Sequence, residues 1–491
     1  MTIDYDLVII GGTLAGRYAA LVATQLKATV ALVESQVNYG FSQHQTLSEI
    51  GKIVHNLNDV AGLGIHLTQA DTAEKCQVSV TWKEAHLYTQ GVISNIQEQN
   101  SLANLAALGV DVILGTGQFQ SMPTSRKLSP HLAFTVNERL LRGRTYLLAS
   151  GSVPDIPEIE GLQTAGYLTL SNIWRSLKQP TLPKNWVIIG GVPQSIEVAQ
   201  TLARLGCNVT LAVKSASILP YTDSEIAHLL QAQLEVDGVR VLTQKPVTQV
   251  KLIEGQKWVQ AGDKAIETDE ILVATGQKPN IEFLNLADVG VKWRQRRLVV
   301  NDKLQTTNHR IYACGDVIGG YDFTNVAKYE ARIAVKNALF FPRFSVNYRC
   351  IPWALDSHPT LAEVGLTEAQ AKRQFRPNEV LVLRQYYKSV TAAQLRDETT
   401  GICKLIVLRN GEILGASILG AEAGELINLI ALAMAQKIPV KQLANLSSAY
   451  PSFSEIIDNT AREWGQQKLN SNPALQDFLE GFFHFRRNWN L

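Results

Sequence analysis

The sequence predicts an α/β protein with two doubly wound domains, followed by an α+β domain. The first observation is an apolar run at 7–10 that ends in glycines, followed by an Ala-rich helical pattern to Leu26 and a second apolar run at 29–33. The same layout recurs over 186–213. A strand, tight turn, helix and strand within about 30 residues form the βαβ opening of a Rossmann-like dinucleotide-binding domain. From about Asn347 the pattern changes to short strands before an amphipathic helix at 422–436.

Composition excludes several classes of protein. The chain has 491 residues, 46% hydrophobic and 18% charged, which excludes a disordered protein. With 46 basic and 44 acidic residues the net charge is +2, so we expect no nucleic-acid partner. Five widely spaced cysteines exclude a disulfide scaffold and a short metal motif, and we expect no metal site. The longest uncharged apolar stretch, 426–435, is too short to span a bilayer, and we expect a cytoplasmic location.

The first glycine turn is a variant of the dinucleotide fingerprint. Gly11, Gly12 and Gly16 occupy it, and Thr13 stands where the middle glycine usually lets the backbone approach a pyrophosphate. Glu34 ends the second strand, where a carboxylate binds an adenosine ribose. The following helix N-terminus offers free N–H groups to the pyrophosphate.

Three further segments extend this pattern. Residues 149–154 and 274–279 are near-copies, each at the end of an apolar run, and residues 312–316 follow a short strand. With these segments the chain resembles the pyridine nucleotide-disulfide oxidoreductases, flavoproteins that include dihydrolipoamide dehydrogenase, glutathione reductase and mercuric reductase. The resemblance covers roughly 4–465. It implies FAD bound by Asp316 at the ribityl and pyrophosphate region, with Thr324 to Ala327 opening the helix that faces the flavin. The implied FAD contacts also include Ser150, Gly151, Gly315, Thr324 and Ala327, and Gly276 is a further implied cofactor contact.

The resemblance also implies the domain limits. Residues 1–155 and 275–345 are the two parts of an FAD-binding domain, and 156–274 form an NAD(P)-binding domain. Residues 346–465 form an interface or dimerisation domain, so a homodimer is expected. Residues 466–491 form a C-terminal amphipathic helical tail.

The second glycine turn departs from the family pattern. Gly190 and Gly191 are kept for NAD(P), but Val192 stands at the middle glycine and would crowd the pyrophosphate. Pro193 has no N–H, and Ser195 replaces the third glycine. After the second strand comes Lys214, a cation that suits the 2′-phosphate of NADP; the alternative is a solvated surface lysine.

The family's redox disulfide is absent. It needs two cysteines on the helix after the first βαβ unit, and these positions fall on Ser42 and Leu47. A serine hydroxyl cannot form the mixed disulfide, so we expect neither disulfide nor mercury reductase activity. The family's lysine that pairs with Glu197 falls on Gly51, and the next residue, Lys52, is the candidate partner. His44, between the cysteine positions, either supplies a proton to the flavin or, as we expect, is an exposed polar residue.

The C-terminal landmark is also changed. The family's acid–base histidine aligns with Tyr450, and its glutamate is kept as Glu455. Mercuric reductases also place a tyrosine there. A tyrosine is a poor base near neutral pH but can donate a hydrogen bond. The similar His358-Pro359-Thr360 segment precedes the first interface-domain strand and is not the counterpart.

The tail begins with Asn472 and Pro473, a helix-start signal. Aromatic residues then recur at helical spacing and end beside Arg486 and Arg487. Either this helix packs on the dimer body, or it lies on a membrane surface, within reach of a lipid-bound quinone.

The sequence thus predicts an FAD enzyme that takes electrons from NAD(P)H and passes them to a quinone or another small oxidant. The catalytic candidates are Lys52, Glu197, Tyr450 and Glu455. The alternative is a flavin-bearing binding or regulatory protein with weak NAD(P)H turnover.

Overall fold

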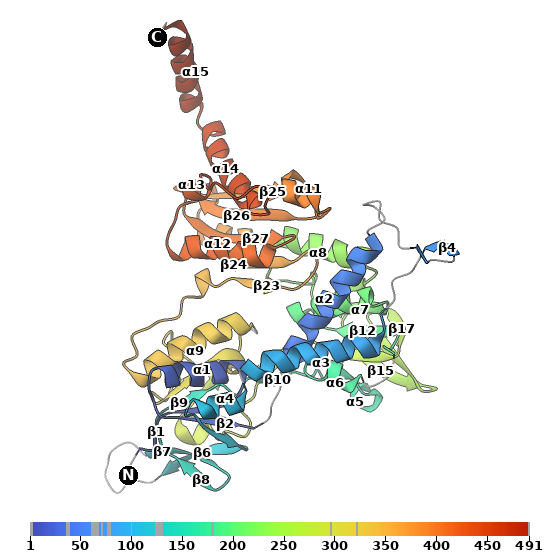
Figure 1. The fold of residues 1–491 in the computed structure, drawn as a ribbon, viewed down its shortest axis with the longest axis vertical. Coiled ribbons are helices and arrows are strands. Elements are labelled where there is room, and N and C mark those ends of the chain that lie inside the picture. Colours follow the sequence, from blue (N-terminus) through green and yellow to red (C-terminus); the bar gives the residue numbers. More distant parts are fainter. Residues whose placement is uncertain are drawn as a thin grey trace. The chain divides into compact units, whose positions relative to one another are not determined.

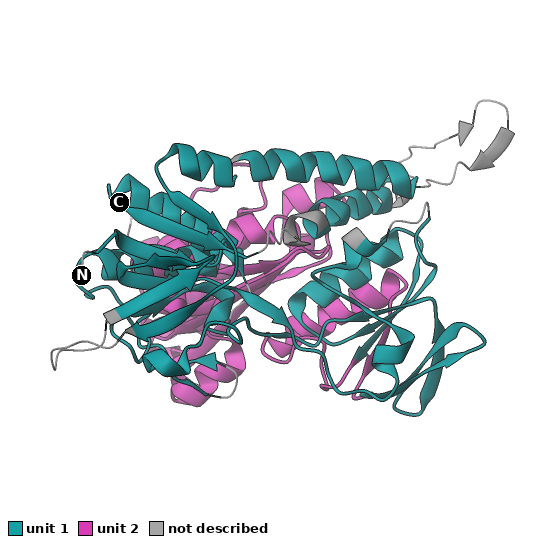
Figure 2. Ribbon diagram, turned by 90° about the horizontal axis from the view of Figure 1, so that it is seen from below, with its two compact units in different colours: residues 1–212, 245–346 teal, residues 213–244, 347–491 magenta. Residues whose placement is uncertain are grey.

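The fold was examined in a computed structural model, which describes residues 3–35, 40–59, 68–69, 72–75, 80–99, 101–122, 131–177, 181–294, 297–320 and 323–489. The chain divides into two compact units (Figure 2). Unit 1 contains residues 1–212 and 245–346, and unit 2 contains residues 213–244 and 347–491. The predicted α/β class is confirmed. The finer domain limits given above stay predictions.

The first sheet of unit 1 is parallel, with the strand order β22 (Ile311–Ala313), β9 (Gly143–Leu148), β1 (Tyr5–Ile10), β2 (Val30–Glu34), β5 (Asp111–Leu114) (Figure 1). One face packs on α1 (Leu14–Gln25) and α9 (Thr324–Leu339). The other face packs on a sheet of β6 (Gly117–Met122), β7 (His131–Val136) and β8 (Arg139–Leu141). Both faces are buried, which explains the continuous apolar run at 7–10.

The second sheet has the order β11 (Leu168–Thr169), β18 (Glu270–Val273), β12 (Asn185–Ile189), β13 (Asn208–Val213), β14 (Arg240–Thr243). The helix after β12 is α7 (Pro193–Arg204), inside the βαβ layout predicted over 186–213. It packs against α2 (Gly40–Asp59), which in turn contacts α3 (Trp82–Gln99) and the short α6 (Ile173–Ser176). The α2 helix is therefore held between elements that lie far apart in the sequence.

The remaining elements of unit 1 are short. They include α4 (Leu102–Ala107), α5 (Leu162–Ala165) and the meander β15 (Val247–Ile253), β16 (Gln256–Ala261), β17 (Lys264–Thr268). Three antiparallel pairs complete it: β10 (Ser152–Pro154) with β19 (Gln277–Pro279), β20 (Trp293–Arg294) with β21 (Arg297–Leu298), and β3 (Thr68–Gln69) with β4 (Thr72–Lys75).

Unit 2 contains an antiparallel sheet in the order β23 (Trp353–Leu355), β24 (Leu361–Gly365), β27 (Ile413–Leu419), β26 (Ile402–Leu408), β25 (Val380–Tyr386). Its core is formed with α12 (Ala423–Ala435), α13 (Val440–Leu443) and α14 (Glu455–Asn470). Helices α8 (Ser224–Val236), α10 (Glu368–Gln374) and α11 (Thr391–Leu395) are also in this unit. Helix α12 matches the predicted helix at 422–436 within one residue at each end.

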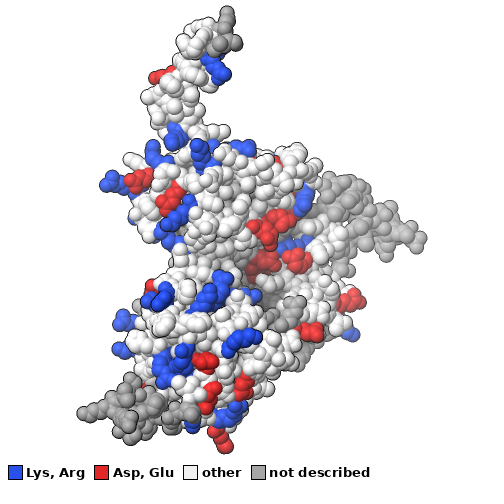
Figure 3. Space-filling model, turned by 60° about the vertical axis from the view of Figure 1, so that its left-hand side comes forward, with Lys and Arg blue, Asp and Glu red and all other residues white. Residues whose placement is uncertain are grey.

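The predicted tail helix is α15 (Pro473–Asn488), and the Asn472 side chain caps it by accepting the Leu475 N–H at 3.1 Å. No residue of α15 is buried. Its exposed aromatic residues are Phe478, Phe482, Phe483, Phe485 and Trp489. The face of the molecule drawn in Figure 3 shows basic and acidic side chains of the described residues interspersed.

Candidate functional site

The turn between β1 and α1 has the geometry that its glycines predict. Gly11 has φ +109°, and a Cβ there would lie 2.3 Å from the Ala149 carbonyl oxygen. A Cβ on Gly16 would lie 1.9 Å from the Gly11 carbonyl oxygen. Thr13, at the middle glycine position, caps α1: its Oγ1 accepts the Gly16 N–H at 3.3 Å and donates to the Ala149 carbonyl at 2.8 Å. Helix α1 therefore starts at close range to the sheet edge, as a dinucleotide site requires.

Glu34 lies directly over this turn. A Cβ on Gly12 would fall 1.5 Å from Glu34 Oε2, so only glycine fits at position 12. The same oxygen forms an ion pair with Arg17 Nη2 at 3.2 Å, and both side chains are buried. Arg17 Nε also donates to the Gly12 carbonyl at 2.9 Å. Sequence reasoning missed Arg17, although a basic residue directly after Gly16, on the helix that must pack on the sheet, is a usable signal.

A cavity of about 160 Å³ opens at this turn. It brings together the predicted residues Gly151, Gly315, Asp316, Thr324 and Ala327. Thr13, at the middle glycine position, also lines it. Sequence reasoning assigned no cofactor contact to the other lining residues: Leu14, Ala15, Ser152, Leu170, Ser171, Gln277 and Phe323. Two predicted contacts are not among the lining residues. Gly276, with φ +127°, is next to the lining residue Gln277. The Oγ of Ser150 donates a hydrogen bond to the Asn280 carbonyl at 2.7 Å.

The chemistry of this cavity fits FAD. Burial raises the pKa of the Asp316 carboxyl, and the hydrogen bond from Ser152 Oγ at 3.4 Å is long. The carboxyl can therefore accept a stabilising hydrogen bond from a ligand hydroxyl, such as those of a ribityl chain. Gly151 and Gly315 have φ +70° and +73°, so the backbone lines the cavity closely. The N-terminus of α9, at Thr324, also lies on it and favours negative charge.

The second glycine turn is tight but poor in donors. Gly190 has φ +126°, and a Cβ there would lie 2.0 Å from the Ala274 carbonyl oxygen. Val192 is the N-cap of α7 without a side-chain hydrogen bond, and Pro193 is its first residue. Ser195 is fully buried and its Oγ donates to the Val192 carbonyl at 2.7 Å. Gly191 is half-buried in this turn, and Lys214, which belongs to unit 2, is exposed.

The helix α2 corrects one prediction. His44 is not exposed: it is 5% accessible, because this face of α2 packs on α7 and α6. Its Nε2 lies 3.1 Å from Glu197 Oε2. Leu47, at the second cysteine position, is fully buried. Lys52 Nζ pairs with Glu49 at 2.9 Å, and its predicted pairing with Glu197 stays a prediction.

The cysteines that the structure describes carry free thiols. Burial raises the pKa of Cys207 to about 11 and of Cys403 to about 12, and it raises the pKa of Cys314 well above the ordinary value. Cys350 is half-buried. A thiol must ionise to act as a nucleophile, so the three buried ones are inert at neutral pH.

Unit 2 holds the two C-terminal candidates. Tyr450 is 76% exposed and precedes Pro451 through a cis peptide bond. Glu455 begins α14 and accepts the Ser452 N–H at 3.1 Å. Tyr450 thus lies at the surface of unit 2, and Glu455 lies at the start of a helix in that unit.

Unit 2 also buries a cluster of charges that sequence reasoning missed. Lys404, 2% accessible, pairs with Asp223 at 2.9 Å, Glu225 at 3.1 Å and Glu368 at 2.7 Å. Beside it, the Glu363 carboxyl accepts from Ser417 Oγ at 2.7 Å and from the Asp223 N–H at 3.1 Å. Burial raises the pKa of Glu363 to about 7, and the Asp223 charge adds to the effect.

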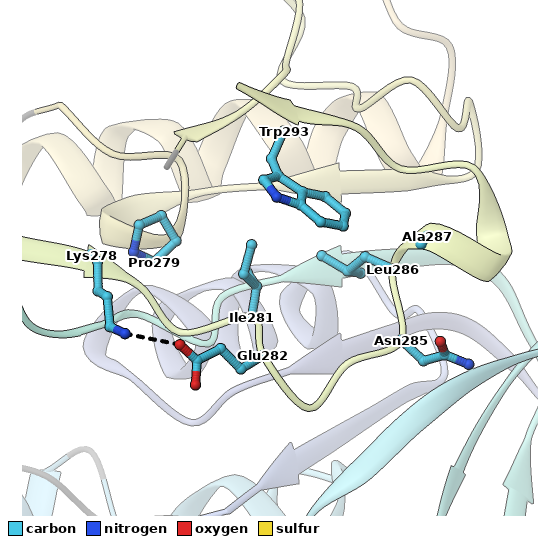
Figure 4. Close-up of a pocket in the computed structure, with 8 residues that line it drawn as sticks. All are labelled: Lys278, Pro279, Ile281, Glu282, Asn285, Leu286, Ala287 and Trp293. Carbon is cyan, nitrogen blue, oxygen red and sulfur yellow. Dashed lines mark hydrogen bonds and ion pairs between the residues drawn. The ribbon is translucent and has the colours of Figure 1, made fainter. Parts of the chain in front are cut away.

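A larger hollow of about 680 Å³ lies elsewhere in unit 1 (Figure 4). Trp293 covers Ile281 and Leu286, and the Lys278–Glu282 ion pair, 2.8 Å long, lies at one side. Lys278 follows Gln277 of the first cavity on the same strand, β19. None of the residues predicted to be catalytic or to bind a cofactor lines this hollow.

No helix in the described part of the chain is both long and apolar enough to cross a membrane. No group of three or more His, Cys, Asp or Glu side chains in these residues could hold a metal ion.

Comparison with known proteins gives consistent matches. Residues 5–331 match the pyridine nucleotide-disulphide oxidoreductase family, and residues 351–461 match its dimerisation domain. The chain is 31% identical to a mercuric reductase of Staphylococcus aureus, over 92% of this chain and 81% of that one. It is 31% identical to a dihydrolipoyl dehydrogenase of Synechocystis sp., over 93% and 98%. Among solved structures, it resembles the HOCl-induced flavoprotein disulfide reductase RclA from Escherichia coli as a Cu(II) complex, with a TM-score of 0.79, 25% identity and coverage of 94% and 99%.

Proposed function

Because the chain belongs to the pyridine nucleotide-disulphide oxidoreductase family and is an NAD(P)H-dependent flavoprotein oxidoreductase, we propose that its electron acceptor is not a disulfide. One observation carries this proposal: residues 39–52, where the family has its two redox cysteines, contain none. Without a thiolate at this place the enzyme cannot form a mixed disulfide there. The relatives named for disulfide or mercury chemistry therefore do not define the substrate of this chain.

FAD would be held by the cavity at the β1–α1 turn. When bound, it supplies the redox centre that accepts hydride. Thr13 fixes the turn, Asp316 offers a carboxyl to a ligand hydroxyl, and the α9 N-terminus offers its dipole to negative charge. The predicted adenosine contact, Glu34, would act with Arg17 beside it.

The acceptor we propose is a quinone or another small oxidant. Both can be reduced by two electrons without a covalent enzyme intermediate. Glu197, with Lys52 as its predicted partner, would act on one side of the site. Tyr450 and Glu455 would act as a hydrogen-bond donor and its supporting carboxylate.

For the nicotinamide cofactor, we propose Gly190 and Gly191 as the binding turn and Lys214 as the contact of a 2′-phosphate, so NADPH is slightly favoured over NADH. A second candidate function follows from the same turn. Val192 and Pro193 leave it with few donors, which favours a flavin-bearing binding or regulatory protein with weak NAD(P)H turnover.

The match to the dimerisation domain supports a homodimer. We further propose that this dimer is cytoplasmic and touches a membrane surface through α15. The support is an exposed aromatic face next to Arg486 and Arg487, a combination that suits the lipid interface.

An anaerobic titration tests the main proposal. The purified protein is titrated with NADH and, separately, with NADPH, while flavin absorbance is followed. Fast bleaching, reversed by a water-soluble quinone but not by lipoamide, glutathione disulfide or Hg²⁺, is the expected result. Disulfide or Hg²⁺ turnover would overturn the proposal, and failure of both nucleotides to reduce the flavin would favour the regulatory alternative.

A further inference from the structure

The imidazole of His44 is buried and has no hydrogen-bond partner in the part of the chain that the structure describes. Its Nε2 is at ion-pairing distance from Glu197, 3.1 Å, but the two groups are not aligned as a hydrogen bond. Neither Nε2 nor Nδ1 has a hydrogen-bond partner among the described residues. A buried polar group without a partner costs about 1–3 kcal/mol, so such a group calls for an explanation.

Aromatic rings fix the position of this imidazole. His44 stacks on Trp174 with the planes 5° apart and the centroids 6.0 Å apart. Trp174 contacts Trp82 at 6.2 Å, and Trp82 contacts His86 at 5.4 Å. Both tryptophans are at most 5% accessible. The ring of His44 is therefore held in one orientation with water excluded on the Trp174 side.

The tryptophan that stacks on this histidine is close in the chain to the FAD cavity. Leu170 and Ser171 line that cavity, and α6, which carries Trp174, begins two residues after Ser171. His44 itself lies on α2, between the two positions where the family carries its redox cysteines. The segment that has lost the thiols thus presents an imidazole paired with a carboxylate.

We propose that His44, held by Glu197 and Trp174, donates the proton that completes reduction of the acceptor; this rests on the proposed function above. Reduction of a quinone by NAD(P)H consumes one proton: NAD(P)H + quinone + H⁺ gives NAD(P)⁺ + hydroquinone. The hydride supplies both electrons and one hydrogen. The second O–H bond forms as the Nδ1–H bond of the His44 imidazolium breaks. The neutral imidazole then regains a proton from water.

The charged groups around His44 support Glu197 as its controlling partner. Its own helix carries Glu49 and Lys52, which pair with each other. From the packed helices come Glu197 and Arg204 on α7, and His86 on α3, which is separated from His44 by the two tryptophans. Of these, Glu197 is the charged group recorded at ion-pairing distance from the imidazole.

The first test compares two electron acceptors. Ferricyanide takes electrons without protons, whereas a quinone needs the proton. We expect His44→Gln to lower kcat for a water-soluble quinone about 100-fold or more, the usual size of general-acid catalysis, and to spare ferricyanide reduction. Added imidazole should restore part of the quinone activity of His44→Ala. His86→Gln, at the far end of the same rings, is the matched control and should keep both activities.

The second test does not use turnover. An imidazolium in contact with an indole quenches its fluorescence. Acidification should therefore quench tryptophan emission of the purified full-length protein, and most of this change should be absent in His44→Gln but kept in His86→Gln. If His44→Gln loses both acceptors equally, or neither, the proton-donor role is wrong while the proposed function stands. If the wild type reduces no acceptor yet shows the His44-dependent quenching, the proposed function fails instead.

Discussion

Glu363 should make unit 2 less stable as the pH rises through the neutral range. Its carboxyl lies between β24 and β27, against Ser417 and the Asp223 N–H. Burial, followed by the Asp223 charge, raises its pKa from 4.5 to about 7. Between these two pH values the folded protein binds a proton that the unfolded chain does not. The stabilisation is complete below pH 4.5 and is lost as the pH passes 7.

The size of the effect follows from the shift. One pKa unit corresponds to about 1.4 kcal/mol, so a shift from 4.5 to about 7 changes the free energy of unfolding by about 3 kcal/mol. Glu368 and Lys404, two of the neighbouring charges, do not titrate in the folded protein in this window, because the pKa of Glu368 is lowered to about 2 and that of Lys404 is raised. Glu363→Gln keeps the shape of the side chain and removes the titration.

Hydrogen exchange followed by mass spectrometry is the suitable assay, since peptides from β24 and β27 report local opening of unit 2. The opening free energy of Glu363→Gln relative to the wild type should rise by about 3 kcal/mol between pH 4.5 and pH 8. If the glutamine side chain changes the opening free energy by an amount that does not depend on pH, this amount cancels in the comparison between the two pH values. A difference that stays constant over this range would refute the assignment of a raised pKa to Glu363.

Four further outcomes are expected. Gly12→Ala should lose FAD, measured by the ratio of flavin to protein absorbance, because its Cβ would lie 1.5 Å from Glu34; Gly481→Ala, with open space around it, is the control. Lys404→Met should destabilise unit 2 by about 3 kcal/mol in urea unfolding, because the buried Asp223 loses the cation it pairs with, while Glu225 and Glu368 keep Arg384; an unchanged midpoint would contradict this. Reductive titration should stop at two electrons per FAD without a thiolate charge-transfer band, and uptake of two more with new thiols would disprove it. Deleting 471–491 should abolish liposome binding while FAD content and thermal stability stay intact; a truncated protein that is unstable or monomeric would instead indicate docking on the dimer.

The features that the sequence predicted are those with local causes. Gly11, Gly16 and Gly190 were recognised because each must let the backbone approach a neighbouring strand within a short turn, and the structure has that geometry. The Asn472 cap and the start of α15 are equally local. The cavity residues came from the family resemblance, which orders motifs that are distant in the chain.

The features that were missed depend on packing over long sequence distances. His44 looks exposed in its polar segment, yet α7 and α6, which start more than 120 residues later, bury it. The partners of Lys404 come from α8 and α10, which no local pattern connects to β26. Arg17 was overlooked because its ion pair with Glu34 needs the β2 strand alongside α1. Burial of a polar side chain is decided by such pairings and not by its neighbours in sequence.

The exposure of the tail helix α15 determines how readily proteases would cleave the chain there. Its 16 residues bury nothing, and a helix of this length is only marginally stable in water without a covering surface. The Asn472 cap and the arginines near its C-terminus each add only about 1 kcal/mol or less. Whatever surface covers its aromatic face therefore also protects its backbone from cleavage. Limited proteolysis beyond residue 470 would report whether the aromatic face of α15 is covered.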